Sequence, residues 1–252
     1  MKLKNLAGIT TIFAIVTVFV GLIFLESTSG VVPDLIVAEV KNDVKIRKAS
    51  SAIWQGARVS MALSMGDSIK TGKDSFATLR FSYPKENSFQ LYENTEVMVA
   101  ELVKGKDVSL KKVNMKMLKG GTWSKLSGAA SKDYRFKITT PNTVAAISGT
   151  SLAVIVYSEE ETYFCACDGV IDIGNPGKSV TIKRAQGSTV KGDAAPTRPV
   201  SDKHIITEKK YEKDPRYAWC IHCHSTMVSG CGAAPEPEIG LFPGCAKKTG
   251  KH

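Results

Sequence analysis

Residues 134–139 read YRFKIT, a stretch in which aromatic or aliphatic side chains alternate with charged or hydroxyl side chains. Successive side chains of a β-strand point to opposite faces, so this period of two predicts a strand with one dry and one wet face. A helix would instead repeat its apolar residues every three or four positions. The stretch therefore favours a half-buried β-strand.

The same alternation recurs on both sides of this stretch. It is found at residues 44–47, 77–82 and 152–156, and the last of these segments ends at the acidic turn 159–161. Short strands separated by turns, with no helical pattern between them, are typical of an antiparallel β-domain. We expect an all-β fold, an antiparallel sandwich or a β-roll, over residues 36–175.

An apolar segment precedes this β-region. Lys2 and Lys4 stand before an uncharged run of twenty residues, Leu6 to Leu25. Such a run rises about 30 Å as a helix, enough to cross a bilayer, whereas the apolar part of a secretory signal has about 7–15 residues. We expect residues 1–30 to be an uncleaved signal anchor with its lysines in the cytoplasm. The protein would then be a single-pass protein of a bacterial inner membrane, with the bulk of its chain in the periplasm.

The C-terminal part has a different composition. Residues 176–216 are rich in small, polar and charged residues and are predicted to form a linker. Residues 217–252, the cysteine-rich tail, hold four of the six cysteines and three of the four histidines. A segment this short cannot bury a core of its own, so it needs disulfides, a metal or a cofactor. All three are compatible with an oxidising compartment.

Several dipeptides in the β-region occur in a characteristic order. They are Gly66-Asp67, Thr71-Gly72, Asn94-Thr95, Gly120-Gly121, Thr140-Pro141, Gly149-Thr150 and Gly169-Val170. In this order and spacing they resemble the landmarks of the FecR-domain family, over about residues 37–173. The resemblance implies a β-rich extracytoplasmic domain that senses or transmits a signal, with iron-uptake regulators as the best-known members. It also implies that the glycines serve tight turns rather than chemistry.

The sharpest chemical motif is Cys220-Ile221-His222-Cys223-His224 in the tail. This C-x-x-C-H pattern is typical of covalent c-type haem attachment. The thiols of Cys220 and Cys223 would bind the two vinyl groups, and the imidazole of His224 would bind the iron. His204 is the favoured second iron ligand, because the terminal His252 would lose more entropy on ordering.

Other interpretations of the tail remain open. The four cysteines Cys220, Cys223, Cys231 and Cys245 could form two disulfides, or they could bind zinc, with or without His224. Trp219 before the C-x-x-C also resembles a thioredoxin-like redox pair, but that fold needs a βαβ frame around the motif.

A second pair of thiols, Cys165 and Cys167, lies within a predicted strand. Residues i and i+2 share a face, so both thiols point the same way. They could form a two-thiolate metal or redox site, pair with Cys231 and Cys245, or serve as small buried residues. The last interpretation is favoured.

Catalysis has little support in the sequence. No histidine precedes His204, so the β-region lacks the usual general base. We therefore expect a protein that is not an enzyme. The net charge of +10 is spread over turn lysines without an arginine and aromatic stripe, which indicates a solvated surface rather than nucleic-acid binding. The expected partner is an envelope protein or polysaccharide, and the oligomeric state is left open.

Overall fold

The computed structural model describes residues 34–82, 85, 87–105, 110–126, 135–147, 149–175, 177–184 and 186–201. These residues form 17 strands and contain no helix, which confirms the predicted all-β fold. Among them there is accordingly no helix that is long and apolar enough to cross a membrane. The chain divides into two units, residues 1–32 and 33–252, and every described residue belongs to the second. The predicted anchor at residues 1–30 and the tail at 217–252 lie outside the described residues.

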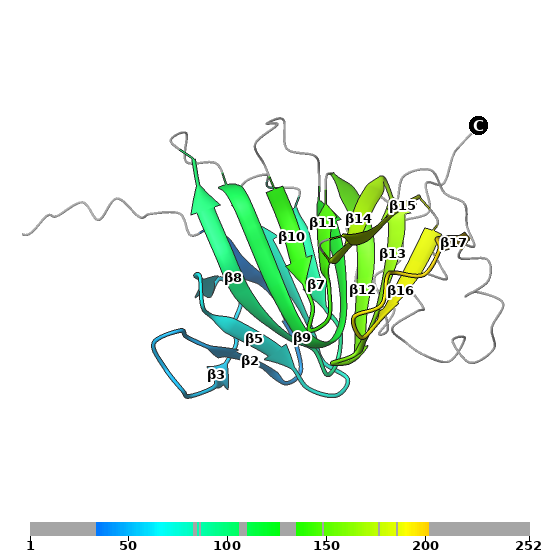
Figure 1. The fold of residues 1–252 in the computed structure, drawn as a ribbon. Helices are drawn as coiled ribbons and strands as arrows, with labels where there is room; N and C mark the ends of the chain where they lie inside the picture. Colours follow the sequence, from blue (N-terminus) through cyan, green and yellow to red (C-terminus); the bar gives the residue numbers. More distant parts are fainter. Residues whose placement is uncertain are drawn as a thin grey trace, which may run out of the picture. The chain divides into compact units, whose positions relative to one another are not determined.

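The strands form two layers that face each other across the core (Figure 1). Layer A contains, from edge to edge, β4 (Ala62–Leu63), β1 (Leu35–Lys41), β6 (Phe76–Phe81), β7 (Ser88–Leu91), the second part of β9 (Leu110–Leu126), β12 (Thr150–Ser158), β13 (Glu161–Asp168), β16 (Gln186–Lys191) and β17 (Val200–Ser201). Layer B contains, from edge to edge, β3 (Gln55–Gly56), β2 (Val44–Arg47), β5 (Ser68–Thr71), β8 (Glu96–Lys104), the first part of β9, β10 (Arg135–Thr139), β11 (Val144–Ile147), β14 (Val170–Asn175) and β15 (Lys178–Lys183).

Strand β9 joins the two layers because it belongs to both. Its residues 110–119 pair with β8 in layer B, and its residues 120–126 pair with β12 in layer A. The change of layer falls at Gly120, whose φ of 86° is a left-handed conformation that other residues rarely adopt. Within the described pairings only β9 and β10 run parallel; the rest are antiparallel, as expected from the sequence.

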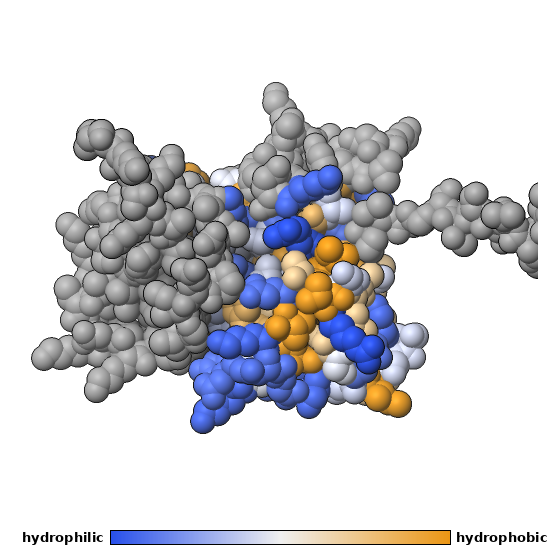
Figure 2. All heavy atoms as spheres, turned by 180° about the vertical axis from the view of Figure 1, so that it is seen from behind, coloured by the Kyte–Doolittle hydropathy of each residue, from blue (hydrophilic) through white to orange (hydrophobic). Residues whose placement is uncertain are grey.

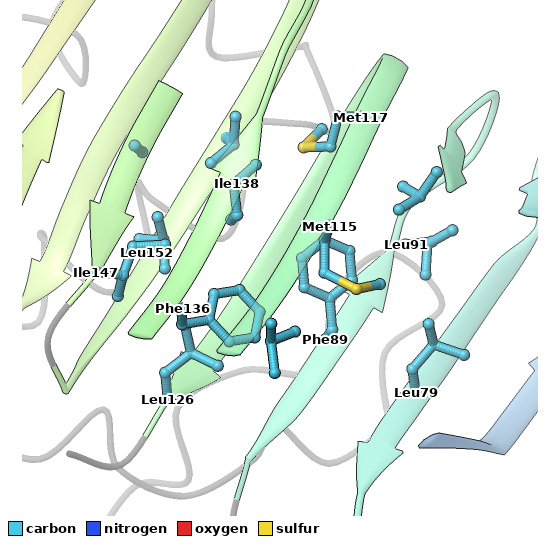
Figure 3. Close-up of a cluster of buried hydrophobic side chains, with 14 of the residues drawn as sticks. Leu79, Phe89, Leu91, Met115, Met117, Leu126, Phe136, Ile138, Ile147 and Leu152 are labelled. Atoms are coloured by element: carbon cyan, nitrogen blue, oxygen red, sulfur yellow. The ribbon is translucent and has the colours of Figure 1, made fainter. Parts of the chain in front are cut away.

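The core lies between the layers and consists of the inward side chains of both (Figure 3). Phe136 from β10 contacts Phe81 from β6 edge to face, with ring centroids 5.7 Å apart. It also lies 6.5 Å from Phe89 of β7 in a stacked arrangement. Phe136 comes from the YRFKIT stretch, so the alternation in that stretch supplies the contact between layers.

The structure corrects the predicted end of the β-domain. The composition of residues 176–216 predicted a linker, yet β15, β16 and β17 lie in this range and belong to the two layers. Strand β16 pairs with β13 over six residues, from Glu161 opposite Lys191 to Ala166 opposite Gln186. The domain therefore continues at least to Ser201.

Gly187 explains why the sequence pattern does not predict strand β16. A Cβ atom on Gly187 would lie 2.2 Å from the hydroxyl oxygen of Tyr163 on β13. The tyrosine ring thus covers a position where β16 has no side chain, and it supplies the apolar contact that β16 lacks. The sequence of β16, QGSTVK, shows little of the alternation on which strand prediction depends.

We predict that Gly187→Ala lowers the free energy of unfolding by about 1–2 kcal/mol, because the added methyl group must displace a buried tyrosine ring. Gly56→Ala in β3 is the matched control, since a Cβ atom on Gly56 would meet no other atom within 4 Å and the φ of this residue is not left-handed. Urea unfolding of both variants measures the difference. Equal stabilities of the two variants would contradict the contact between Tyr163 and β16.

Candidate functional site

The residues predicted to bind haem lie outside the described part of the chain. Cys220, Cys223, His224 and His204 all follow Ser201, the last described residue. The haem site, with zinc as its alternative, therefore stays a prediction.

Cys165 and Cys167 lie on β13 and are both buried. Phe164 and Ala166 alternate with them and point into the core, so the two cysteines share the outer face of layer A, as expected. The Cys167 sulfur lies 3.9 Å from the carbonyl oxygen of Cys165. No group of three or more His, Cys, Asp or Glu side chains that could hold a metal occurs within the described residues. This burial agrees with the favoured interpretation of the pair as small buried residues.

The buried carboxylate of Asp67 is the centre of a polar cluster. Lys48 donates to it at 2.6 Å, and the same ammonium group donates to the carbonyl oxygen of Ala62 at 2.7 Å. The backbone N–H groups of Ala49 and Ser64 donate at 2.9 Å and 2.8 Å. Asp67 thereby ties the turn after β2 to the turn before β5. The sequence pattern indicated only a turn aspartate.

These contacts set the protonation state of Asp67. Burial by itself raises the pKa of a carboxyl group, but the hydrogen bonds from Lys48, Ser64 and Ala49 and the charge of Lys48 outweigh it. The pKa of Asp67 is therefore lowered, and the group is ionised at neutral pH. An ionised, fully bonded carboxylate of this kind holds a turn in place and is a poor general acid or base.

A second polar cluster surrounds the point where β9 changes layer. The side-chain oxygen of Thr95 accepts from the N–H of Gly121 at 2.9 Å and lies 3.0 Å from the carbonyl oxygen of the same residue. The N–H of Thr95 donates to the hydroxyl of Thr71 at 3.0 Å, and that hydroxyl donates to the carbonyl oxygen of Tyr92. A Cβ atom on Gly120 would lie within 2.5 Å of Thr95. Three of the sequence landmarks, 71–72, 94–95 and 120–121, thus meet here.

Two further landmarks meet in the same manner. Gly169, between β13 and β14, has a φ of 76°, and a Cβ atom there would lie 2.8 Å from Cβ of Thr150. Gly169 and the dipeptide Gly149-Thr150 are therefore neighbours in space. Both mark places where the chain passes from one layer to the other.

Asn142 closes one end of the two layers. It lies in the turn after β10 and donates to the carbonyl oxygens of Glu160 and Val190 at 3.0 Å and 3.1 Å. Its amide oxygen accepts from Thr162 at 2.7 Å, and its carbonyl oxygen accepts from Asn175 at 2.9 Å. The turn that carries Thr140-Pro141 is thus bonded to strands and turns of both layers.

The exposed surface carries one further notable group. The Trp54 ring lies beneath two cations, with Lys70 at 4.1 Å and Arg47 at 4.8 Å from its centre. Ile53, Val59 and Met65 are each more than half exposed. Figure 2 shows hydrophobic side chains gathered on one face of the molecule between hydrophilic ones.

Residues 67–171 match the model of the FecR protein family. This part of the chain is similar to FecR domains. The match confirms the resemblance seen in the sequence, within narrower bounds than the expected 37–173. No curated protein matches the chain.

Two crystal structures of a candidate anti-sigma factor from Parabacteroides distasonis are similar to this chain. Both share 12% sequence identity with it and cover 55% of it, with TM-scores of 0.43 and 0.42. The similarity spans 63% and 62% of those chains, which is less than two thirds of their length.

The FecR-like range 67–171 occupies the middle of both layers. The matched range includes β5 to β13 in full and reaches the start of β14, where it ends at Ile171. Strands β1 to β4 extend one edge, and β15 to β17 extend the other. The landmarks that resemble those of FecR domains are therefore residues that hold the two layers together, and within the described residues none of them forms a catalytic arrangement.

We predict that Asp67→Asn destabilises the protein by about 1–3 kcal/mol at pH 7, because Lys48 loses its charged partner. The folded-state pKa of Asp67 is lowered, so its contribution is fully present above the unfolded pKa of about 3.9 and is lost as the pH falls through the folded value. The difference between the wild type and Asp67→Asn should therefore shrink below about pH 4. Urea unfolding across this pH range measures it.

The matched control is Asp193→Asn, which removes an exposed carboxylate from the turn after β16. It should change the stability by less than about 0.5 kcal/mol at any of these pH values. A stability difference for Asp67→Asn that stays constant from pH 7 to pH 2 would contradict the assignment.

Proposed function

We propose that this chain is a membrane-anchored periplasmic signalling protein in which the FecR domain is the non-catalytic scaffold. The observation that carries the proposal is the FecR match over residues 67–171. FecR domains are a regulatory kind of domain. The apolar run from Leu6 to Leu25 supports an anchor at the inner membrane.

The structure of the domain supports the scaffold role. The hydroxyl of Thr95 and the amide of Asn142 are engaged with the backbone of neighbouring strands, and the carboxylate of Asp67 with turns. Groups that are committed in this way stabilise the fold and are not available for acid–base chemistry. A sensing or transmitting role needs only a stable surface and a partner, and an envelope protein or polysaccharide suits that surface.

The proposal extends to the tail, where Cys220, Cys223 and His224 would hold a c-type haem. The donor set has the two thiols and the imidazole that such a haem requires. A bound haem would supply one-electron transfer or the binding of a small ligand at iron. The FecR domain would then report the state of the haem to a partner.

A second candidate function needs no haem. The tail cysteines could be joined by disulfides or could bind zinc, and the protein would be an interaction or signalling module of the envelope. The buried thiols of Cys165 and Cys167 support this alternative, because they could form disulfides with tail cysteines.

We predict that the full chain, produced together with the haem-ligation machinery, gives a Soret band and a c-type pyridine haemochrome spectrum. Replacing both Cys220 and Cys223 by serine should abolish both signals, because the thioethers can no longer form. Replacing Cys165 and Cys167 by serine is the matched control and should leave the spectrum unchanged. A wild-type protein without haem would exclude the haem proposal and leave the disulfide or zinc alternative.

His204 is tested in the same preparation. His204→Ala should convert a low-spin spectrum to a high-spin one while the haem stays attached, because the iron loses its second axial ligand. An unchanged low-spin spectrum would remove His204 from the site.

A further inference from the structure

A row of exposed side chains crosses the outer face of layer B near the end to which the arrow of β8 points (Figure 1). Val103 of β8 lies opposite Lys112 of β9, and Lys112 lies opposite Arg135 of β10. Further along the layer, Val170 of β14 lies opposite Lys183 of β15. We call these five residues the basic row.

The register of layer B shows that the two parts of the basic row are level with each other. Phe136 and Ile171 directly follow Arg135 and Val170, and both lie opposite Ile147 of β11. The row therefore crosses β8, β9, β10, β11, β14 and β15 in one line. With about 4.8 Å between neighbouring strands, it is about 24 Å long.

The side chains of the basic row face water. Lys112, Arg135 and Lys183 are exposed, and Val103 and Val170 are 39% and 45% exposed. Each of the five has a neighbour along its strand that packs in the core, so the row lies on the outer face. Basic side chains interleaved with exposed apolar ones are typical of protein surfaces that bind at a membrane interface.

The basic row also gathers positive charge without an acid beside it. Lys112 and Arg135 stand opposite each other on neighbouring strands, where like charges destabilise a sheet. The exposed Arg184 follows Lys183 and adds a further charge. Among the described residues of the row none is acidic. Anionic groups placed on the row would relieve this repulsion.

The chain enters the β-domain beside the basic row. Asp34, the first described residue, forms an ion pair with Lys104 at 2.9 Å, and Lys104 directly follows Val103. Eight residues (33 − 25 = 8) separate Asp34 from Leu25, where the apolar run ends. Even when fully extended, this connection spans only about 30 Å. An anchor in the apolar run would therefore keep this end of the domain close to the bilayer.

The opposite end of the two layers carries the opposite charge. This is the end at which Lys41 pairs with Phe76 and Glu161 pairs with Lys191. Its turns contain one basic residue among those described, Lys73, and the acidic residues Asp43, Asp74, Glu93, Glu159, Glu160 and Asp193. A domain with one basic and one acidic end turns its basic end towards an anionic surface.

We propose that the basic row docks the β-domain on a bilayer surface that contains anionic phospholipid, with the acidic end turned away from the membrane. The inference rests on the proposed anchor at residues 1–30 and adds an orientation to it. The basic side chains contact lipid phosphates, and Val103 and Val170 enter the headgroup layer. Each lysine or arginine near an anionic bilayer strengthens binding about five-fold.

Lysine labelling of the full chain in lipid nanodiscs tests the proposal. Mass spectrometry measures how fast an N-hydroxysuccinimide ester acetylates each lysine, in nanodiscs of phosphatidylcholine and in nanodiscs that also contain phosphatidylglycerol. We expect Lys112 and Lys183 to react about five-fold more slowly in the anionic nanodiscs. The exposed Lys73 and Lys119, at the opposite end, should react equally fast in both. Sodium chloride at about 1 M should remove the difference, because it shortens the Debye length to about 3 Å.

A charge reversal within the basic row gives a second measurement. Arg135→Glu changes the centre of the row, and Lys73→Glu is the matched control at the opposite end; both residues are exposed. Arg135→Glu should bring the rates at Lys112 and Lys183 in anionic nanodiscs to within about two-fold of their values in neutral ones. Lys73→Glu should keep the slow rates of the wild type.

The outcomes separate docking from anchoring. A chain that does not stay with the nanodiscs during size-exclusion chromatography would overturn the anchor and this proposal together. A chain that stays, but whose Lys112 and Lys183 react at the same rate in both lipid compositions, would overturn the docking and leave the anchor in place. If that shared rate is slow, protein rather than lipid covers the row.

Discussion

The hydrogen bonds between Thr95 and Gly121 are the constraint on which the rest of the structure depends. Strand β9 can serve both layers only if its backbone turns sharply at Gly120, and a turn inside the protein leaves backbone groups without ladder partners. The Thr95 hydroxyl accepts from the N–H of Gly121, whose carbonyl oxygen accepts from the N–H of Tyr92. Leaving the N–H of Gly121 buried without a partner would cost about 1–3 kcal/mol.

This constraint explains what the FecR landmarks do. Thr95, Gly120 and Gly169 stand where the chain passes between layers, and each contributes a hydroxyl or a left-handed φ that the crossing requires. The crossings fix the two layers against each other.

The sequence predicts the strands with clear alternation, such as β10, because their period of two reflects one buried and one wet face. Prediction from the sequence fails for β16, because its apolar contact is made by Tyr163 of β13, which covers Gly187. It identifies Asp67 and Thr95 only as turn residues, since their partners Lys48 and Gly121 are distant in the chain and no local pattern indicates them. The shared face of Cys165 and Cys167 was predictable, because it follows from strand geometry alone. The proposed haem residues, Cys220 and His224, lie outside the described residues.

The measurement that tests the central claim most directly is the stability of Thr95→Val compared with Thr95→Ser. Valine keeps the shape of threonine and removes the hydroxyl, whereas serine keeps the hydroxyl and removes a methyl group. The account predicts that Thr95→Val lowers the free energy of unfolding by about 2–3 kcal/mol, because the N–H of Gly121 loses its acceptor. Thr95→Ser should lose only about 1 kcal/mol, for its methyl group. Equal losses in the two variants, or a Thr95→Val variant as stable as the wild type, would contradict the claim that this hydroxyl holds the crossing between the layers.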